Sequence, residues 1–176
     1  YMVEKLIKNG ILVTHTGKIK GNLAIRGGKI CAVTSPEEDV EAAEVIDAAG
    51  KYVIPGLIDS HVHFQDPGFT DREDFEHGTA AGAAGGVTTA ISHPLNDPPI
   101  VDKESYQFPI RAYEGKGVID YGIHGGGTPT NIHQIDDLWK NTGAVSIKMF
   151  MCFSVAEFPY VQDDALYQIL KKVAEN

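Results

Sequence analysis

Strand-like runs of apolar residues recur from Val53 onward at intervals of about 30 residues, the length of one strand–helix unit. These runs are rich in β-branched residues and flanked by glycine or proline, and they predict strands at 53–60, 87–92, 118–124 and 144–150. Strands that alternate with helices at this spacing favour a parallel sheet, because parallel strands need a long crossover connection.

Helices are expected between and after these strands. Their expected first residues or caps, read from capping signals and helical periodicity, are Thr70, Asp102, Thr130 and Asp163. The first helix has a capping-box pattern over 70–73 and is expected to end near Gly85-Gly86, and the third is expected to run to Gly143. Pro109 predicts a kink or restart inside the second helix.

The first 53 residues show another pattern, in which short apolar runs are separated by turn dipeptides. Asn9-Gly10 and Gly27-Gly28 are each expected to form a hairpin turn. A further strand is expected around 45–47, with a turn at Ala49-Gly50. We therefore predict a small N-terminal β-domain over residues 1–53, followed by an α/β domain over residues 54–176.

Composition and charge limit the classes of function. The formal net charge of −9 argues against nucleic acid or an anionic membrane as a partner. No apolar run approaches the length of a membrane span. Cys31 and Cys152 are too few for a disulfide framework, so a reducing cytoplasm is the expected location.

The pair His61 and His63 directly follows the first strand-like run of the α/β part. On an extended backbone, residues i and i+2 point to the same face, so both imidazoles can converge on one point. Two neutral imidazoles held in this way suit a divalent metal such as Zn²⁺. A solvated or core-satisfied histidine pair has the same sequence, so the pair alone leaves both interpretations open.

Four segments in order resemble the cyclic amidohydrolases, the family of dihydroorotase, allantoinase and hydantoinase or dihydropyrimidinase. They are PGLIDSHVHFQDPG (55–68), EHGTAAGAAGGVTTAISHPLNDPP (76–99), GGGTPTNIHQIDDLW (125–139) and SIKMFMCFS (146–154). The resemblance implies the N-terminal part of a (β/α)₈ TIM-like barrel, about four βα units, preceded by a small β-sandwich-type domain. It also implies that the chain is the N-terminal portion of a longer protein, and a homo-oligomer is expected.

The resemblance assigns metal-binding roles to His61, His63 and Lys148. Lys148 matches the family's KxF segment, whose lysine reacts with CO₂ to form a carbamate that bridges two divalent metal ions, with Zn²⁺ as the expected metal. A solvated surface lysine is the alternative. His124 ends the third expected strand, but the family places no metal ligand there. The family's remaining ligands, two histidines and an aspartate that is also the general base, have no counterpart in this sequence. We therefore assign no catalytic residue and expect weak or absent metal and no hydrolysis by this chain alone.

Three residues are candidates for substrate binding. Gln65 stands where dihydroorotase has an arginine and allantoinase usually an asparagine. Asn96 lies in a PLN segment like that of allantoinase, although a turn role is a close alternative. Phe153 stands where hydantoinases have a tyrosine, and His93 replaces the methionine usual before PLN. The pattern is most like an allantoinase that opens a small cyclic amide or ureide. Dihydroorotase and a non-catalytic amidohydrolase-like scaffold protein are the alternatives.

Overall fold

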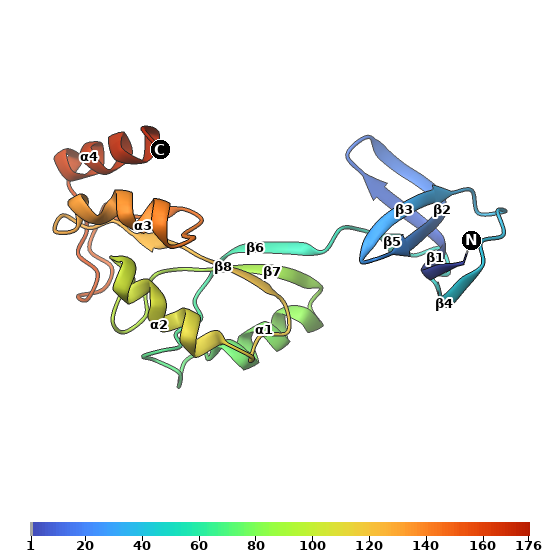
Figure 1. The fold of residues 1–176 in the computed structure, drawn as a ribbon, viewed down its shortest axis with the longest axis horizontal. Coiled ribbons are helices and arrows are strands. Elements are labelled where there is room, and N and C mark those ends of the chain that lie inside the picture. The colour runs from blue at the N-terminus through green and yellow to red at the C-terminus, as the bar shows by residue number, and fades with distance from the viewer. Residues whose placement is uncertain (1) are drawn as a thin grey trace. The chain divides into compact units, whose positions relative to one another are not determined.

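Residues 2–176 are described by a computed structural model, in which the chain divides into two units. The first ends at Pro55, and the second runs from Gly56 to Asn176. Figure 1 shows strands alone in the first unit and alternating strands and helices in the second. Within residues 2–176, no helix is both long and apolar enough to cross a bilayer.

The first unit is a five-stranded mixed sheet. Its strands are β1 (Val3–Thr14), β2 (Gly17–Arg26), β3 (Lys29–Thr34), β4 (Ala42–Asp47) and β5 (Tyr52–Val53). The order is β3-β2-β1-β4, and β5 also pairs with β1. Antiparallel pairing joins β1 to β2 and β2 to β3, whereas β4 and β5 run parallel to β1. Val3, Leu6 and Ala24 form its buried core.

The expected hairpin turn at Asn9-Gly10 is wrong. Strand β1 continues through both residues, with a register shift against β2 between Ile7 and Gly10. Asn9 has a φ of 58°, and its N–H donates to Asn22 Oδ1 at 3.0 Å. A Cβ on Gly10 would lie 2.7 Å from the Val53 side chain, so close packing also requires glycine there. The dipeptide therefore forms a β-bulge, in which Asn9 has the left-handed backbone conformation that is also found in tight turns.

The second unit alternates strands and helices. Its elements are β6 (Leu57–Val62), α1 (Phe75–Ala84), β7 (Val87–Ser92), α2 (Lys103–Tyr113), β8 (Asp120–Ile123), β9 (Gly125–Gly126), η1 (Ile132–Gln134), α3 (Ile135–Asn141), β10 (Ile147–Lys148) and α4 (Asp163–Ala174). Strands β6, β7 and β8 form a parallel sheet in that order, and β9 pairs in parallel with β10. The expected strand at 87–92 is confirmed, and the last expected strand is shorter than predicted.

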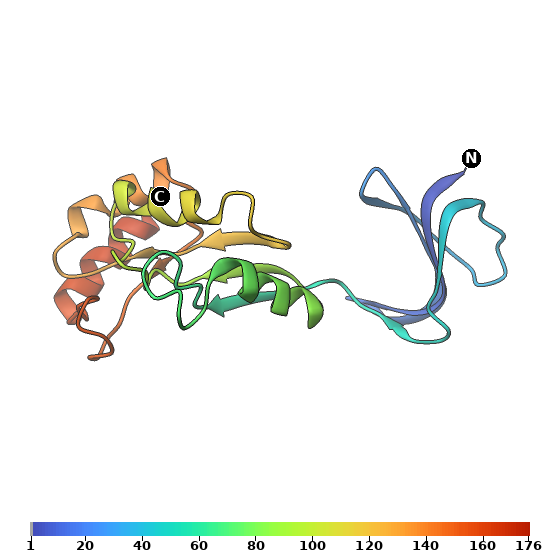
Figure 2. The ribbon, with the colours of Figure 1, turned by 90° about the horizontal axis from the view of Figure 1, so that it is seen from below.

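Apolar side chains hold the helices against these strands. Phe75 in α1 stacks on Tyr113 in α2, with ring centroids 3.8 Å apart and an angle of 8° between the planes. Phe64 meets Phe75 edge-on at 5.1 Å. Helices α3 and α4 lie side by side in both views (Figures 1 and 2) and share a second core with Ile135 and Ile169. The loop after β6 is thus anchored through Phe64 in the main core.

Two of the expected helix caps are wrong, and one is confirmed. Helix α1 is capped by Asp74, which accepts from the His77 N–H, so the segment from Thr70 to Glu73 precedes the helix. Thr130 does not cap α3, because a 3₁₀ turn comes first. Asp102 caps α2 with a capping box, and Pro109 lies inside α2 without ending it. A capping sequence supplies an acceptor for the free N–H donors of a helix start, and it locates that start only to within a few residues.

Candidate functional site

Four imidazoles and a lysine lie at or just beyond the carboxyl ends of the strands in the second unit. Parallel strands end at one edge of a sheet, so these side chains gather from segments far apart in sequence. The residues are His61 in β6, His63 after it, His93 after β7, His124 after β8 and Lys148 in β10. Backbone hydrogen bonds from His93 N to Val62 O (2.8 Å) and from His124 N to Ser92 O (2.9 Å) align these strand ends.

The four rings form one cluster with His93 at its centre. The ring centroid of His93 lies 4.0 Å from that of His61, 5.1 Å from that of His63 and 4.7 Å from that of His124. The rings of His61 and His63 are themselves 5.4 Å apart. Sequence reasoning missed the place of His93, although it follows an expected strand much as the histidine pair does.

Burial and nearby positive charge favour the neutral form of His63 and His93. Burial, with the positive charges of His61 and Lys148 next in importance, lowers the pKa of His93 to about 3. Burial also lowers the pKa of His63, again with contributions from His61 and Lys148. Lys148 contributes to the lowered pKa of both rings, and its Nζ sits 4.6 Å from the centroid of the Phe150 ring. Neutral imidazoles keep a lone pair for a metal ion.

The donors present fit part of a metal site. Imidazole nitrogens suit Zn²⁺ and similar metals. The buried Nδ1 of His93 has no hydrogen-bond partner within residues 2–176. Over the same residues, no group of three or more histidine, cysteine, aspartate or glutamate side chains is arranged to hold a metal ion. A metal at His61 and His63 would therefore need further ligands.

His124 is held through both of its ring nitrogens. Its Nδ1 lies 2.5 Å from Ser146 Oγ, and its Nε2 lies 3.1 Å from the Ser60 carbonyl oxygen. The residue is 9% exposed. It is therefore a fixed part of the framework around the histidine pair.

The structure brings together two of the three substrate-binding candidates. Gln65 and Asn96 line a cavity of about 150 Å³ together with Arg72 and Phe158. Phe153 does not line this cavity and is 73% exposed.

Asn96 itself is 2% exposed, and its side chain holds a loop in place. Its Nδ2 donates to the carbonyl oxygens of Phe64 (3.3 Å), Asp66 (2.9 Å) and Pro67 (3.4 Å). Its Oδ1 is buried without a partner within residues 2–176. The amide nitrogen thus ties the loop after β7 to the loop that follows the histidine pair.

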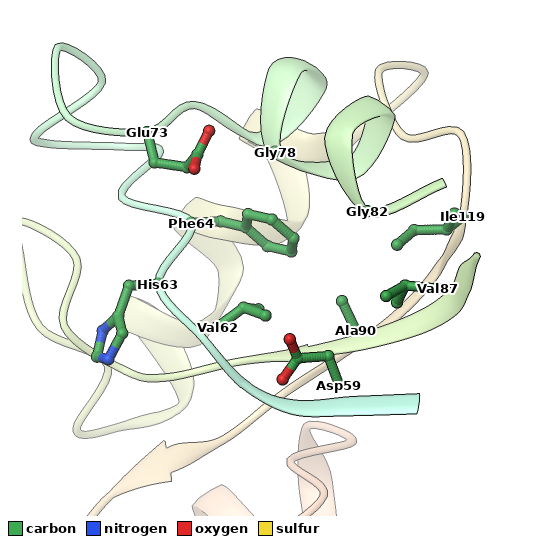
Figure 3. A pocket seen from close by; sticks show the side chains of 10 residues that line it. All are labelled: Asp59, Val62, His63, Phe64, Glu73, Gly78, Gly82, Val87, Ala90 and Ile119. Atoms are coloured by element: carbon green, nitrogen blue, oxygen red, sulfur yellow. The ribbon is translucent and has the colours of Figure 1, made fainter. Parts of the chain in front are cut away.

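A second cavity, of about 200 Å³, lies between the sheet and α1 (Figure 3). Val62, Phe64 and Ala90 line it, with Asp59 and Glu73 at its sides. Figure 3 shows the His63 ring directed away from the ring of Phe64, on the other side of the backbone. His63 nevertheless lines this cavity as well, so it is the member of the imidazole cluster that borders both spaces.

Comparison with known proteins identifies the family. The model of the amidohydrolase family matches residues 52–176, which is most of the chain. The chain belongs to the amidohydrolase family. The amidohydrolase chain is 41% identical over 168 residues to an allantoinase of Deinococcus radiodurans, covering 94% of this chain and 37% of that protein. It is 33% identical to an L-hydantoinase of Paenarthrobacter aurescens, covering 98% of this chain and 38% of that protein.

Solved structures agree with this assignment. The L-hydantoinase (dihydropyrimidinase) from Arthrobacter aurescens matches with a TM-score of 0.92 and 33% identity, over 99% of this chain and 39% of that chain. A D-hydantoinase matches with a TM-score of 0.81 and 35% identity, over 97% of this chain and 38% of that chain. The amidohydrolase chain thus spans less than two fifths of the length of these relatives. The expected fold, part of a TIM-like barrel preceded by a small β-domain, is confirmed.

Proposed function

We propose that this chain contributes the histidine pair and the bridging lysine of a metal-dependent hydrolase that opens cyclic amides. The observation that carries the proposal is the gathering of His61, His63 and Lys148 at one strand edge of an amidohydrolase fold. When bound, a pair of divalent ions such as Zn²⁺ supplies a nucleophile at neutral pH and polarises the substrate carbonyl. The further ligands and the general base come from the barrel strands that the longer relatives possess.

We propose that Lys148 acts as a carbamate in the complete site. Its neutral amine donates a lone pair to the carbon of CO₂, an N–C bond forms, and the amine releases a proton. One C=O π bond of CO₂ opens as the N–C bond forms, and the carbamate carries a single negative charge shared by two oxygens, so a positive charge beside His61, His63 and His93 is replaced by a negative one. Burial, followed by the positive charges of His61 and Lys148, lowers the pKa of both His63 and His93, and a carbamate at Lys148 would remove one of those positive charges.

The substrate we favour is a neutral ureide such as allantoin. Gln65 has no charge with which to pair the carboxylate of dihydroorotate, and leaving that charge unpaired in a buried site costs several kcal/mol (about 3 or more). Gln65 lines a cavity in which its amide would meet a ureido group, and Asn96, which lines the same cavity, holds the loop that carries Gln65. Several of the similar curated proteins are allantoinases. Hydantoin-type rings are the second candidate, because of the TM-score of 0.92 to an L-hydantoinase.

Turnover of allantoin, hydantoin and dihydroorotate by the Zn²⁺-loaded protein with all its barrel strands tests this function. We expect allantoin to be opened best, and His61→Asn to lower kcat by at least about a hundredfold, because a ligand of the metal pair is lost. His133→Asn is the matched control, since His133 is an exposed histidine away from the site. Faster turnover of dihydroorotate would contradict the substrate assignment. Full activity of His61→Asn would contradict the metal assignment, and no turnover of any of the three rings by the unaltered protein would favour a scaffold role.

We further propose that the protein works in a reducing compartment such as the cytoplasm and as a homo-oligomer. Cys31 and Cys152 are both free and exposed, which suits reducing conditions. On β6, Ile58 is 68% exposed and Leu57 is 48% exposed. These apolar side chains form a strand surface that further polypeptide, such as a second copy of the protein, would bury.

A further inference from the structure

One buried side chain joins the strand ends that carry the proposed ligands, and the proposed reaction does not use it. His124 reaches Ser60 through Nε2 and Ser146 through Nδ1. Ser60 directly precedes His61, and Ser146 is two residues before Lys148. The two hydrogen bonds therefore end within one or two residues of a proposed ligand on each side.

Backbone pairing does not supply this link within residues 2–176. Strand β6 pairs with β7, and β10 pairs with β9, but β6 and β10 do not pair with each other. The β10 end is fixed to β9 by Gly125 N–H to Ser146 O (2.8 Å) and Gly127 N–H to Lys148 O (2.8 Å). The His124 ring instead links the end of the strand that carries the histidine pair to the segment that carries Lys148, with one hydrogen bond to each.

The partners also fix the tautomer of His124. The Ser60 carbonyl can only accept a hydrogen bond, so Nε2 must carry the hydrogen. In a neutral ring, Nδ1 then has a lone pair and accepts from the Ser146 hydroxyl. His93 packs against this ring on one side and against His61 on the other, which restricts rotation of all three rings.

We propose that His124 is a positioning residue that sets the separation between His61 and Lys148 through Ser60 and Ser146. The inference rests on the proposed function, because it takes those two residues as metal ligands. Ligand geometry matters steeply for metal affinity, and loss of an outer partner of a ligand typically weakens binding ten- to hundredfold. His124 touches neither reacting atoms nor substrate in this account, and it acts only through the two strand ends.

The first test uses the metal-free chain and is independent of any metal. Long-range proton–nitrogen NMR correlations of the imidazoles report which ring nitrogen is protonated. We expect His124 to show a single tautomer with hydrogen on Nε2. We expect Ser146→Ala to reduce that preference and shift the ring resonances of His61, and Ser146→Thr to restore both. Mixed tautomers of His124 in the unaltered chain would overturn the proposal, as would unchanged His61 resonances in Ser146→Ala.

The second test measures Zn²⁺ binding by the same variants. We expect the dissociation constant for Zn²⁺ to rise about tenfold in Ser146→Ala and further in His124→Phe, which removes both hydrogen bonds at similar size. Ser154→Ala is the matched control, because Ser154 is an exposed serine near the same segment. Equal Zn²⁺ affinity in Ser146→Ala and the unaltered chain would overturn the proposal. If the protein with all its barrel strands shows no Zn²⁺ response at His61, the proposed function fails, and the tautomer and resonance data still decide the role of His124.

Discussion

The imidazole rings of His61 and His93 lie with their centroids 4.0 Å apart and their planes tilted by 31°. His93 is 7% exposed, and its Nδ1 has no partner within residues 2–176. An unpaired buried polar atom destabilises a protein by about 1–3 kcal/mol. Replacing it with an apolar side chain of similar volume should relieve that penalty.

His93→Met should therefore raise the free energy of unfolding by about 1 kcal/mol. This net gain is the penalty of the unpaired buried nitrogen that is removed, less the packing energy of the lost ring. Urea denaturation of the chain measures this. His133→Met, at an exposed histidine, should change stability by less than about 0.5 kcal/mol. A loss of stability in His93→Met would show that the imidazole has a hydrogen-bonded or ligating role that outweighs its burial.

The cap of α1 predicts a pH effect. The hydrogen bond to Asp74 and its negative charge raise the pKa of His77, and the His77 backbone and ring in turn lower the pKa of Asp74. A raised histidine pKa stabilises the fold below about pH 6.5, and the gain is lost as pH rises through the folded-state pKa. The lowered Asp74 pKa stabilises above about pH 3.9 and is lost as pH falls through the folded-state pKa.

An NMR titration of the His77 ring should therefore give a midpoint above 6.5. Asp74→Asn keeps a good N-cap but removes the charge, so it should bring the midpoint back towards the ordinary value. An unchanged midpoint in Asp74→Asn would show that the ion pair does not form in solution.

The stability of an Asn96 variant distinguishes a structural role of this residue from a role in substrate binding. Its amide nitrogen donates to three carbonyl oxygens of the loop after the histidine pair, so Asn96→Ala should lower the free energy of unfolding by about 2 kcal/mol. Asn141→Ala is the control, because Asn141 is exposed and its amide donates only to Asp137 in the same helix, so the substitution should cost less than about 0.5 kcal/mol. Unchanged stability in Asn96→Ala would instead favour a role limited to substrate.

Much of the second unit followed from patterns in the sequence. The strand over Val87–Ser92, the cap at Asp102 and the helix from Asp163 were predictable because apolar periodicity and capping act locally. The Asn9-Gly10 bulge was not, since a residue pair that tolerates positive φ suits a bulge as well as a hairpin. The choice is made by β4 and β5, which pair along β1 on both sides of the bulge.

The candidate site, too, was predictable from the sequence only in part. His61 and His63 were visible as a pair because alternate residues of a strand share a face. The central place of His93 and the bridge made by His124 depend on how β7 and β8 align beside β6, which is long-range information. Asn96 looked like a turn or substrate residue, and its three loop contacts appear only once the loops after β6 and β7 pack together.

The most direct test of a metal site at the histidine pair is a Zn²⁺ titration followed through the imidazole NMR resonances of all seven histidines. We predict that His61 and His63 respond before His15 and His133, and that the metal is weakly held and lost on gel filtration, because only part of a ligand set is present. Zn²⁺ that leaves His61 and His63 unperturbed would contradict the metal assignment. Two ions that stay bound to each chain would contradict the incomplete ligand set.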